Sequence, residues 1–126
     1  MTRIRPVGTM LVAYDGTPSA RRALQRTVAL YRDGCGVGVI NVNEHGDDRA
    51  GHLEEARRVL AANGIESRSI AVAGSAAHTI CVVADRDGYD TIVVGRRNLR
   101  DAGQLLLGSV AARVVSGAMC DVVVVA

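Results

Sequence analysis

The chain has 126 residues, a net charge of +2 and 48% hydrophobic residues, and its aromatic side chains are three Tyr. This length predicts one domain spanning residues 1–126, and the small charge with so few aromatic rings argues against a nucleic-acid partner. All fifteen basic residues are Arg, which excludes lysine-dependent chemistry such as that of P-loop nucleotide hydrolases, Schiff-base enzymes and receiver domains.

The cysteines and the apolar runs indicate the cellular location of the protein. Cys35, Cys81 and Cys120 form no C-x-x-C pair, so we expect buried, reduced thiols. No signal-peptide apolar region opens the sequence, and no apolar run approaches the ~18 residues of a membrane span. We therefore expect a cytoplasmic protein without a membrane partner.

The first half of the chain alternates apolar strands with amphipathic helices. A buried strand is predicted over 9–14, and Thr17 followed by Pro18 predicts the start of a helix. That helix is expected to reach Asp33, with Gly34 as its stop. The next predicted elements are a strand over 37–43, a helix over 52–63 and a strand over 65–72. The polar residues of this third strand suit the edge of a sheet.

The second half continues the alternation. Gly74 and Ser75 precede a predicted helix that runs to Asp87 and stops at Gly88. A β-branched strand over 91–94 follows and ends at Gly95, and the last predicted elements are a helix over 109–116 and a strand over 122–125. Five strands alternating with four helices predict a doubly wound α/β fold, in which a parallel sheet carries helices on both faces.

This fold class predicts the position of a ligand. In open α/β sheets, ligands bind beyond the carboxyl ends of the strands, where the strand order reverses. The first and fourth strands are expected to flank that point, and they lead into Asp15 and Gly95. Asp15 has two interpretations: its carboxylate accepts hydrogen bonds from a ligand, or it belongs to a common Asp-Gly turn.

The segment after the fourth strand is the most distinctive in the chain. Its loop over 96–107 carries Arg96 and two further arginines, and it is longer than most connections in this fold class. Gly108 and Ser109 then open an apolar helix, with Ser109 as the expected N-cap. Because a helix N-terminus presents unpaired N–H groups and partial positive charge, the segment predicts an anion site. The arginines either contribute to it or form a solvated surface.

Patterns for catalysis and for metal binding are missing from the sequence. His45, His52 and His78 share no metal-ligand spacing, and no serine stands in a G-x-S-x-G context. We therefore expect no catalytic residues and no metal ligands.

From Thr9 to Val125 the sequence resembles the universal stress protein family. The likeness lies in D-G-T-P-S after the first strand, G-S-A-A-H-T-I-C at the third helix, T-I-V-V-G at the fourth strand and L-L-L-G-S-V-A-A-R-V-V into the last helix. Nucleotide-binding members carry G-x2-G-x9-G-[ST]. Here Gly95, Gly108 and Ser109 match this motif, and Asn98 stands where the second glycine belongs. The resemblance implies an adenine-nucleotide alpha-hydrolase-like fold with strand order 3-2-1-4-5.

The resemblance also implies a ligand, a set of contacts and a partner. The ligand would be ATP or AMP, with or without Mg²⁺. The implied contacts are Ala13, Tyr14 and Asp15 to adenosine, the Val42 backbone to adenine, and Gly95, Asn98, Gly108, Ser109 and Val110 to ribose and phosphates. The implied partner is a second copy of the chain, docked through the last strand, Val122–Val125.

Asn98 leaves two functions open. Asparagine tolerates the left-handed region, so it can replace a glycine that is needed for positive φ. Where a phosphate contacts the glycine Cα, however, the asparagine side chain would collide with it. The first function is an adenine-nucleotide-binding regulatory protein of the stress response with at most slow ATP hydrolysis. The alternative is a dimeric stress protein that binds no nucleotide and acts through protein partners.

Overall fold

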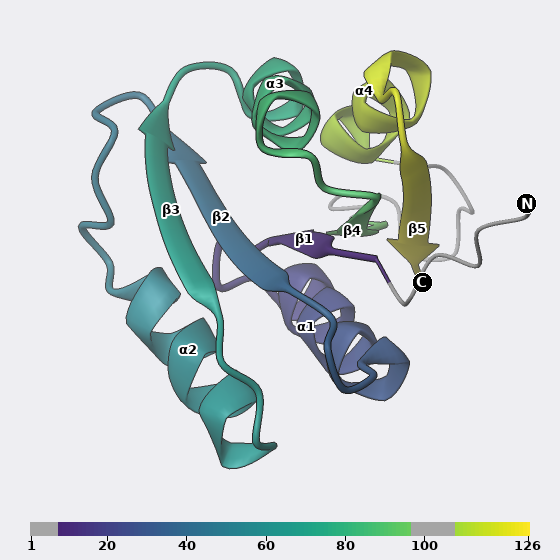
Figure 1. The fold of residues 1–126 in the computed structure, drawn as a ribbon. Helices are drawn as coiled ribbons and strands as arrows, with labels where there is room; N and C mark the ends of the chain where they lie inside the picture. Colours follow the sequence, from purple (N-terminus) through teal and green to yellow (C-terminus); the bar gives the residue numbers. More distant parts are fainter. Residues whose placement is uncertain (1–7, 97–107) are drawn as a thin grey trace, which may run out of the picture.

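The computed structural model describes residues 8–96 and 108–126, and these residues form a five-stranded parallel sheet covered by helices on both faces (Figure 1). In chain order the elements are β1 (Met10–Ala13), α1 (Pro18–Leu30), β2 (Val37–Asn43), α2 (His52–Ala62), β3 (Arg68–Ala73), α3 (Ala76–Asp87), β4 (Thr91–Gly95), α4 (Ser109–Gly117) and β5 (Asp121–Val125). The strand order is β3-β2-β1-β4-β5. The predicted fold class and strand order are both confirmed.

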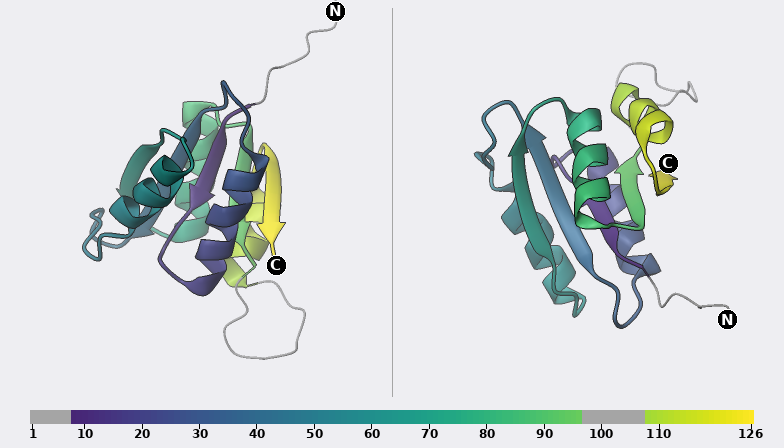
Figure 2. Two further views of the ribbon diagram at one scale, coloured as in Figure 1. Left: turned by 90° about the horizontal axis from the view of Figure 1, so that it is seen from below. Right: turned by 45° about the horizontal axis from the view of Figure 1, so that its top comes forward.

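Alternation along the strands builds two separate cores. Met10 and Val12 of β1 pack with α1 and α2, whereas Leu11 between them packs with α3 and α4. In β4, Val93 joins the first core and Val94 the second. This follows because successive strand side chains point to opposite faces of the sheet. Figure 2 shows the two helix pairs on opposite sides of the sheet.

β3 lies at one edge of the sheet, as its polarity predicts, but it begins later than expected. Ile65 was predicted as its first residue, and instead its N–H donates to the Leu60 carbonyl at 2.9 Å. Ile65 is buried beside the end of α2 and so closes that helix. Pairing with β2 starts at Arg68, which lies opposite Gly38.

The predicted end of α1 is wrong by three residues. The helix ends at Leu30 instead of Asp33, because Tyr31 adopts extended backbone angles (φ −62°, ψ 138°). The chain then turns, with the Cys35 N–H donating to the Arg32 carbonyl at 2.9 Å. Gly34 sits in this turn with φ of 88°, so it serves the return to β2 and does not cap the helix.

The N-terminus of α2 is capped from a distance by Asp48, which lies between the predicted strand over 37–43 and the predicted helix over 52–63. Its two carboxylate oxygens accept hydrogen bonds from the N–H groups of His52 at 2.9 Å and Leu53 at 2.7 Å. Gly51 stands at the cap position with φ of 72° and has no side chain to offer. The cap therefore comes from three residues upstream of Gly51.

Replacing Asp48 by alanine is expected to lower the free energy of unfolding by about 1–2 kcal/mol, because two amides at the start of α2 lose a charged acceptor. Urea denaturation measures this change. Asp47→Ala is the matched control, since the Asp47 carboxylate pairs with Arg49 on the surface and such pairs contribute about 0–1 kcal/mol. Equal losses in the two variants would show that Asp48 is not the cap.

Candidate functional site

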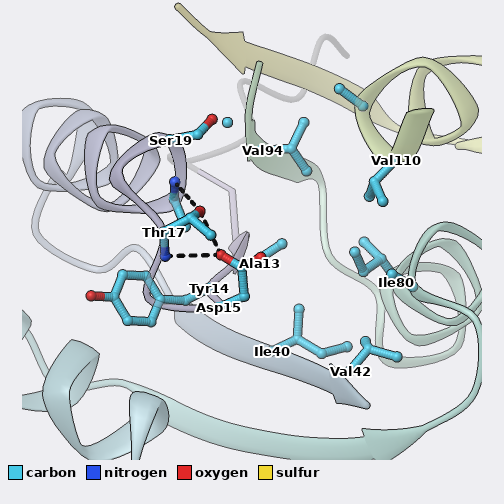
Figure 3. A pocket seen from close by; sticks show the side chains of 14 residues that line it. Ala13, Tyr14, Asp15, Thr17, Ser19, Ile40, Val42, Ile80, Val94 and Val110 are labelled. Carbon is cyan, nitrogen blue, oxygen red and sulfur yellow. Dashed lines mark hydrogen bonds between the residues drawn. The ribbon is translucent and has the colours of Figure 1, made fainter. Parts of the chain in front are cut away.

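A cleft opens at the carboxyl ends of β1 and β4, where the strand order reverses (Figure 3). About 590 Å³ of space lies within it when the open solvent at its mouth is included. Six residues implied by the family resemblance line it together: Ala13, Tyr14, Asp15, Val42, Gly95 and Val110. They come from β1 and the turn after it, from β2, from β4 and from α4. The cleft therefore brings together segments far apart in the sequence.

Gly108 and Ser109 lie at the start of α4, next to the end of β4. The Gly108 N–H donates to the carbonyl of Arg96 at 2.8 Å, and Arg96 directly follows Gly95. The amides of the first helical turn have no intrahelical acceptor, because the first such bond runs from the Ala112 N–H to the Gly108 carbonyl, at 3.0 Å. Asn98 lies outside the described residues, as do the other two arginines of the loop.

The expected N-cap at Ser109 is wrong by one residue. Gly108 holds the cap position with extended backbone angles (φ −64°, ψ 160°), and Ser109 is the first helical residue. The hydrogen bond from Gly108 to Arg96 fixes the extended residue one position earlier than the sequence predicts. No side chain among the described residues caps this helix.

Most of the wall of the cleft consists of apolar side chains, and three of them were not predicted as site residues. Ile40 of β2, Ile80 of α3 and Val94 of β4 all line it, together with Val42 and Val110. In Figure 3 these five side chains surround the opening from β2, β4, α3 and α4. The signal that could have found Val94 is its position just before Gly95, at the carboxyl end of its strand. Such a wall suits a flat, largely apolar ring better than a chain of charges.

Asp15 takes part in a turn. Its Oδ1 accepts hydrogen bonds from the Thr17 N–H at 3.1 Å and from the Thr17 hydroxyl at 2.6 Å. The Thr17 Oγ1 in turn accepts from the Ala20 N–H at 3.2 Å and caps α1, as predicted. The turn interpretation of Asp15 is confirmed, and the residue also lines the cleft.

Tyr14 lines the cleft while its ring points away from the apolar wall (Figure 3). The ring is buried in the core that the sheet shares with α1 and α2. Its hydroxyl donates to the Glu55 carboxylate on α2. Burial raises the pKa of Tyr14, with a further rise from the hydrogen bond to Glu55, and this same hydrogen bond lowers the pKa of Glu55.

The described lining residues carry little reactive chemistry. Apart from the phenol of Tyr14, which points elsewhere, the polar side chains are those of Asp15, Thr17 and Ser19. The described part of the chain contains no group of three or more His, Cys, Asp and Glu residues arranged to hold a metal ion. Across residues 8–96 and 108–126, each helix falls short of the length and apolarity that crossing a bilayer requires. What the described lining offers is mainly apolar side chains, with the polar groups of Asp15, Thr17 and Ser19 among them.

Residues 6–126 match the family model described as the universal stress protein family. The chain belongs to this family. It is 33% identical to a universal stress protein of Synechocystis, called Sll1654, in an alignment that covers 93% of this chain and 84% of the relative. The family membership that the sequence motifs indicated is thus confirmed.

Two solved structures of the family combine the same fold with a bound adenine nucleotide. One is a universal stress protein in complex with cAMP, which is 28% identical, has a TM-score of 0.74, and covers 94% of this chain and 96% of its own. The other is a family member from Arabidopsis thaliana with AMP bound, at 20% identity and a TM-score of 0.73, covering 95% and 91% of the two chains. At that lower identity the likeness shows the fold alone.

Proposed function

We propose that this chain is a regulatory protein of the stress response that binds an adenine nucleotide, AMP or ATP, in the cleft between β1 and β4. The observation that carries the proposal is the convergence of the apolar wall with the amide-rich start of α4. Adenine would lie against Ile40, Val42 and Ile80, where a flat ring buries apolar surface. The related structure with cAMP supports this class of ligand.

The phosphates would lie at the opposite end of the cleft, near Gly95 and the first turn of α4. There the amides of Ser109 and Val110 lack intrahelical acceptors, and the helix dipole favours negative charge. Mg²⁺ would be coordinated by the phosphates of ATP and by water, because the described residues contain no cluster of side chains arranged to hold a metal ion. We also propose that ATP turnover is slow at most, since Asp15, the one carboxylate of the described lining, already accepts hydrogen bonds from the Thr17 N–H and hydroxyl.

Thermal unfolding with and without nucleotide tests the proposal. AMP or ATP at about 100 times its dissociation constant adds about 2.7 kcal/mol to the free energy of unfolding, which raises the melting temperature by roughly 10 °C for a chain of this size. Inorganic phosphate and GTP at the same concentrations are the controls. A second measurement assays adenine nucleotide released from the purified protein by boiling. If the melting temperature does not shift and boiling releases no adenine nucleotide, nucleotide binding is refuted.

A second candidate function is that of a dimeric protein acting through protein partners. Val115 and Met119 are apolar yet 49% and 86% exposed. Val115 belongs to α4, and Met119 lies in the turn that leads from α4 into the edge strand β5. An edge strand presents unpaired backbone groups to a partner. We propose a homodimer through Val122–Val125 in either case, and a cytoplasmic location. A dimer in light scattering, together with no nucleotide response, would favour this second function.

A further inference from the structure

We infer that Glu55 and His52, on α2 and outside the cleft, are positioning residues for the nucleotide site, acting through Tyr14 and Gly16. This inference rests on the proposed function. Its subject is the turn over 14–17, which leads from β1 into α1 and supplies Tyr14, Asp15 and Thr17 to the cleft.

The backbone of Tyr14 is held on the sheet side by β2. Its N–H donates to the Ile40 carbonyl at 3.0 Å, and its carbonyl accepts from the Asn41 side-chain amide, also at 3.0 Å. Two hydrogen bonds thus fix one residue of the turn against the strand that forms the floor of the cleft. Further contacts hold the turn from α2.

Glu55 supplies that hold through the Tyr14 side chain. The ring is 2% exposed, so its hydroxyl needs an acceptor inside the protein, and the Glu55 carboxylate provides it. Arg21 of α1 lies 3.6 Å from the same carboxylate oxygen. Glu55 therefore links α2 to the first residue of the turn and to the helix that the turn begins.

His52 holds the turn two residues further on. Its ring meets the Tyr14 ring edge to face, with centroids 6.3 Å apart and planes at 77°. A Cβ placed on Gly16 would overlap the imidazole, and Gly16 has a φ of 76°, so the His52 ring lies against a backbone that only glycine readily provides. One helix thus contacts both neighbours of Asp15.

Asp15 and Thr17 connect these contacts to the cleft. Because Asp15 accepts two hydrogen bonds from Thr17, a shift of Tyr14 or Gly16 moves the residues that line the cleft. Neither Glu55 nor His52 lines it. Changes at Glu55 are therefore expected to alter nucleotide affinity without removing any contact to the nucleotide.

Four variants test the inference by titration calorimetry with AMP. Glu55→Ala and Tyr14→Phe are each expected to weaken binding about fivefold to tenfold, the range that loss of one buried hydrogen bond gives. The double variant is expected to bind like either single variant, because the two residues form one contact. Glu55→Gln keeps a side-chain acceptor for the Tyr14 hydroxyl and is expected to restore affinity to within about twofold of the wild type.

Glu54→Ala is the matched control, because Glu54 lies on the same helix turn but pairs with Arg57 and Arg58 instead of Tyr14. It is expected to bind AMP like the wild type. Hydrogen exchange without nucleotide gives an independent measurement: amides over 14–17 are expected to exchange faster in Glu55→Ala than in Glu54→Ala.

The outcomes separate the inference from the proposed function. Wild-type protein that binds no adenine nucleotide refutes the function, and this inference with it. Wild-type binding with unchanged affinity in Glu55→Ala overturns the inference alone. Additive losses in the double variant, no rescue by Glu55→Gln, or unchanged exchange over 14–17 would also overturn it.

Discussion

Replacing Gly95 by alanine is expected to lower the free energy of unfolding by about 2 kcal/mol and the melting temperature by about 6–10 °C. A Cβ on Gly95 would overlap the main-chain carbonyl of Ser19 and its side-chain hydroxyl. Ser19 is buried in the first turn of α1, so its backbone cannot move without shifting the helix. Differential scanning calorimetry measures the change.

Gly117→Ala is the matched control for this prediction. Its Cβ would lie 3.6 Å from the Cys81 sulfur, an ordinary contact, at the last residue of α4. Alanine restricts the unfolded chain more than glycine does, so the control is expected to be neutral or to gain up to about 1 kcal/mol. A Gly95→Ala protein as stable as Gly117→Ala would show that α1 does not approach β4 as closely as described.

The absence of a side chain at Gly95 affects both the stability of the fold and the shape of the cleft. Ser19 and Ala20 line the cleft on one side of Gly95, so the close packing of α1 on β4 also sets the width of the cleft there. This explains in physical terms why a glycine ends β4: it gives room to a helix backbone. Gly95 is also the first glycine of the motif G-x2-G-x9-G-[ST] that nucleotide-binding family members carry.

The fold was predictable because its signals are local and repeated. Alternating apolar runs and helical periodicity predict five strands and four helices, and the sheet then follows from general rules for parallel α/β folds. The edge position of β3 followed from the polarity of its residues. What failed were boundaries at Tyr31, Ile65 and Gly108, where a tertiary hydrogen bond or a turn determines the last or first residue.

A site residue was predictable only where its position at a strand end or its match to the family motif pointed to it. Asp15 and Gly95 could be placed at the cleft because they follow or end the strands that flank the switch point, and Val42 could be placed there through the family resemblance. The wall formed by Ile40, Ile80 and Val94 could not be predicted, because the sequence pattern of a β-branched side chain is the same whether it packs in the core or lines a cleft. The contact between Tyr14 and Glu55 spans 41 residues, and no sequence pattern pairs them.

Replacing Gly108 by leucine is expected to abolish binding of AMP and ATP, with a loss of at least about 100-fold in affinity, equivalent to about 2.7 kcal/mol. The phosphates are proposed to lie against the amides at the start of α4, and a branched side chain at the cap position would occupy that space. The stabilisation of roughly 10 °C expected at saturating nucleotide would then disappear. Calorimetric titration and nucleotide-dependent melting measure both effects.

The backbone of Gly108 makes this prediction specific for the ligand. Its φ of −64° is open to every residue type, so leucine imposes no left-handed strain, and the protein without nucleotide is expected to lose no more than about 1 kcal/mol. Gly108→Ala, with a single added methyl group, should fall between leucine and wild type in affinity. If the leucine variant binds nucleotide as wild type does, the phosphates do not lie at the start of α4. The apolar wall would then have to bind the ligand without the helix dipole, since the amides of Ser109 and Val110 would be out of its reach.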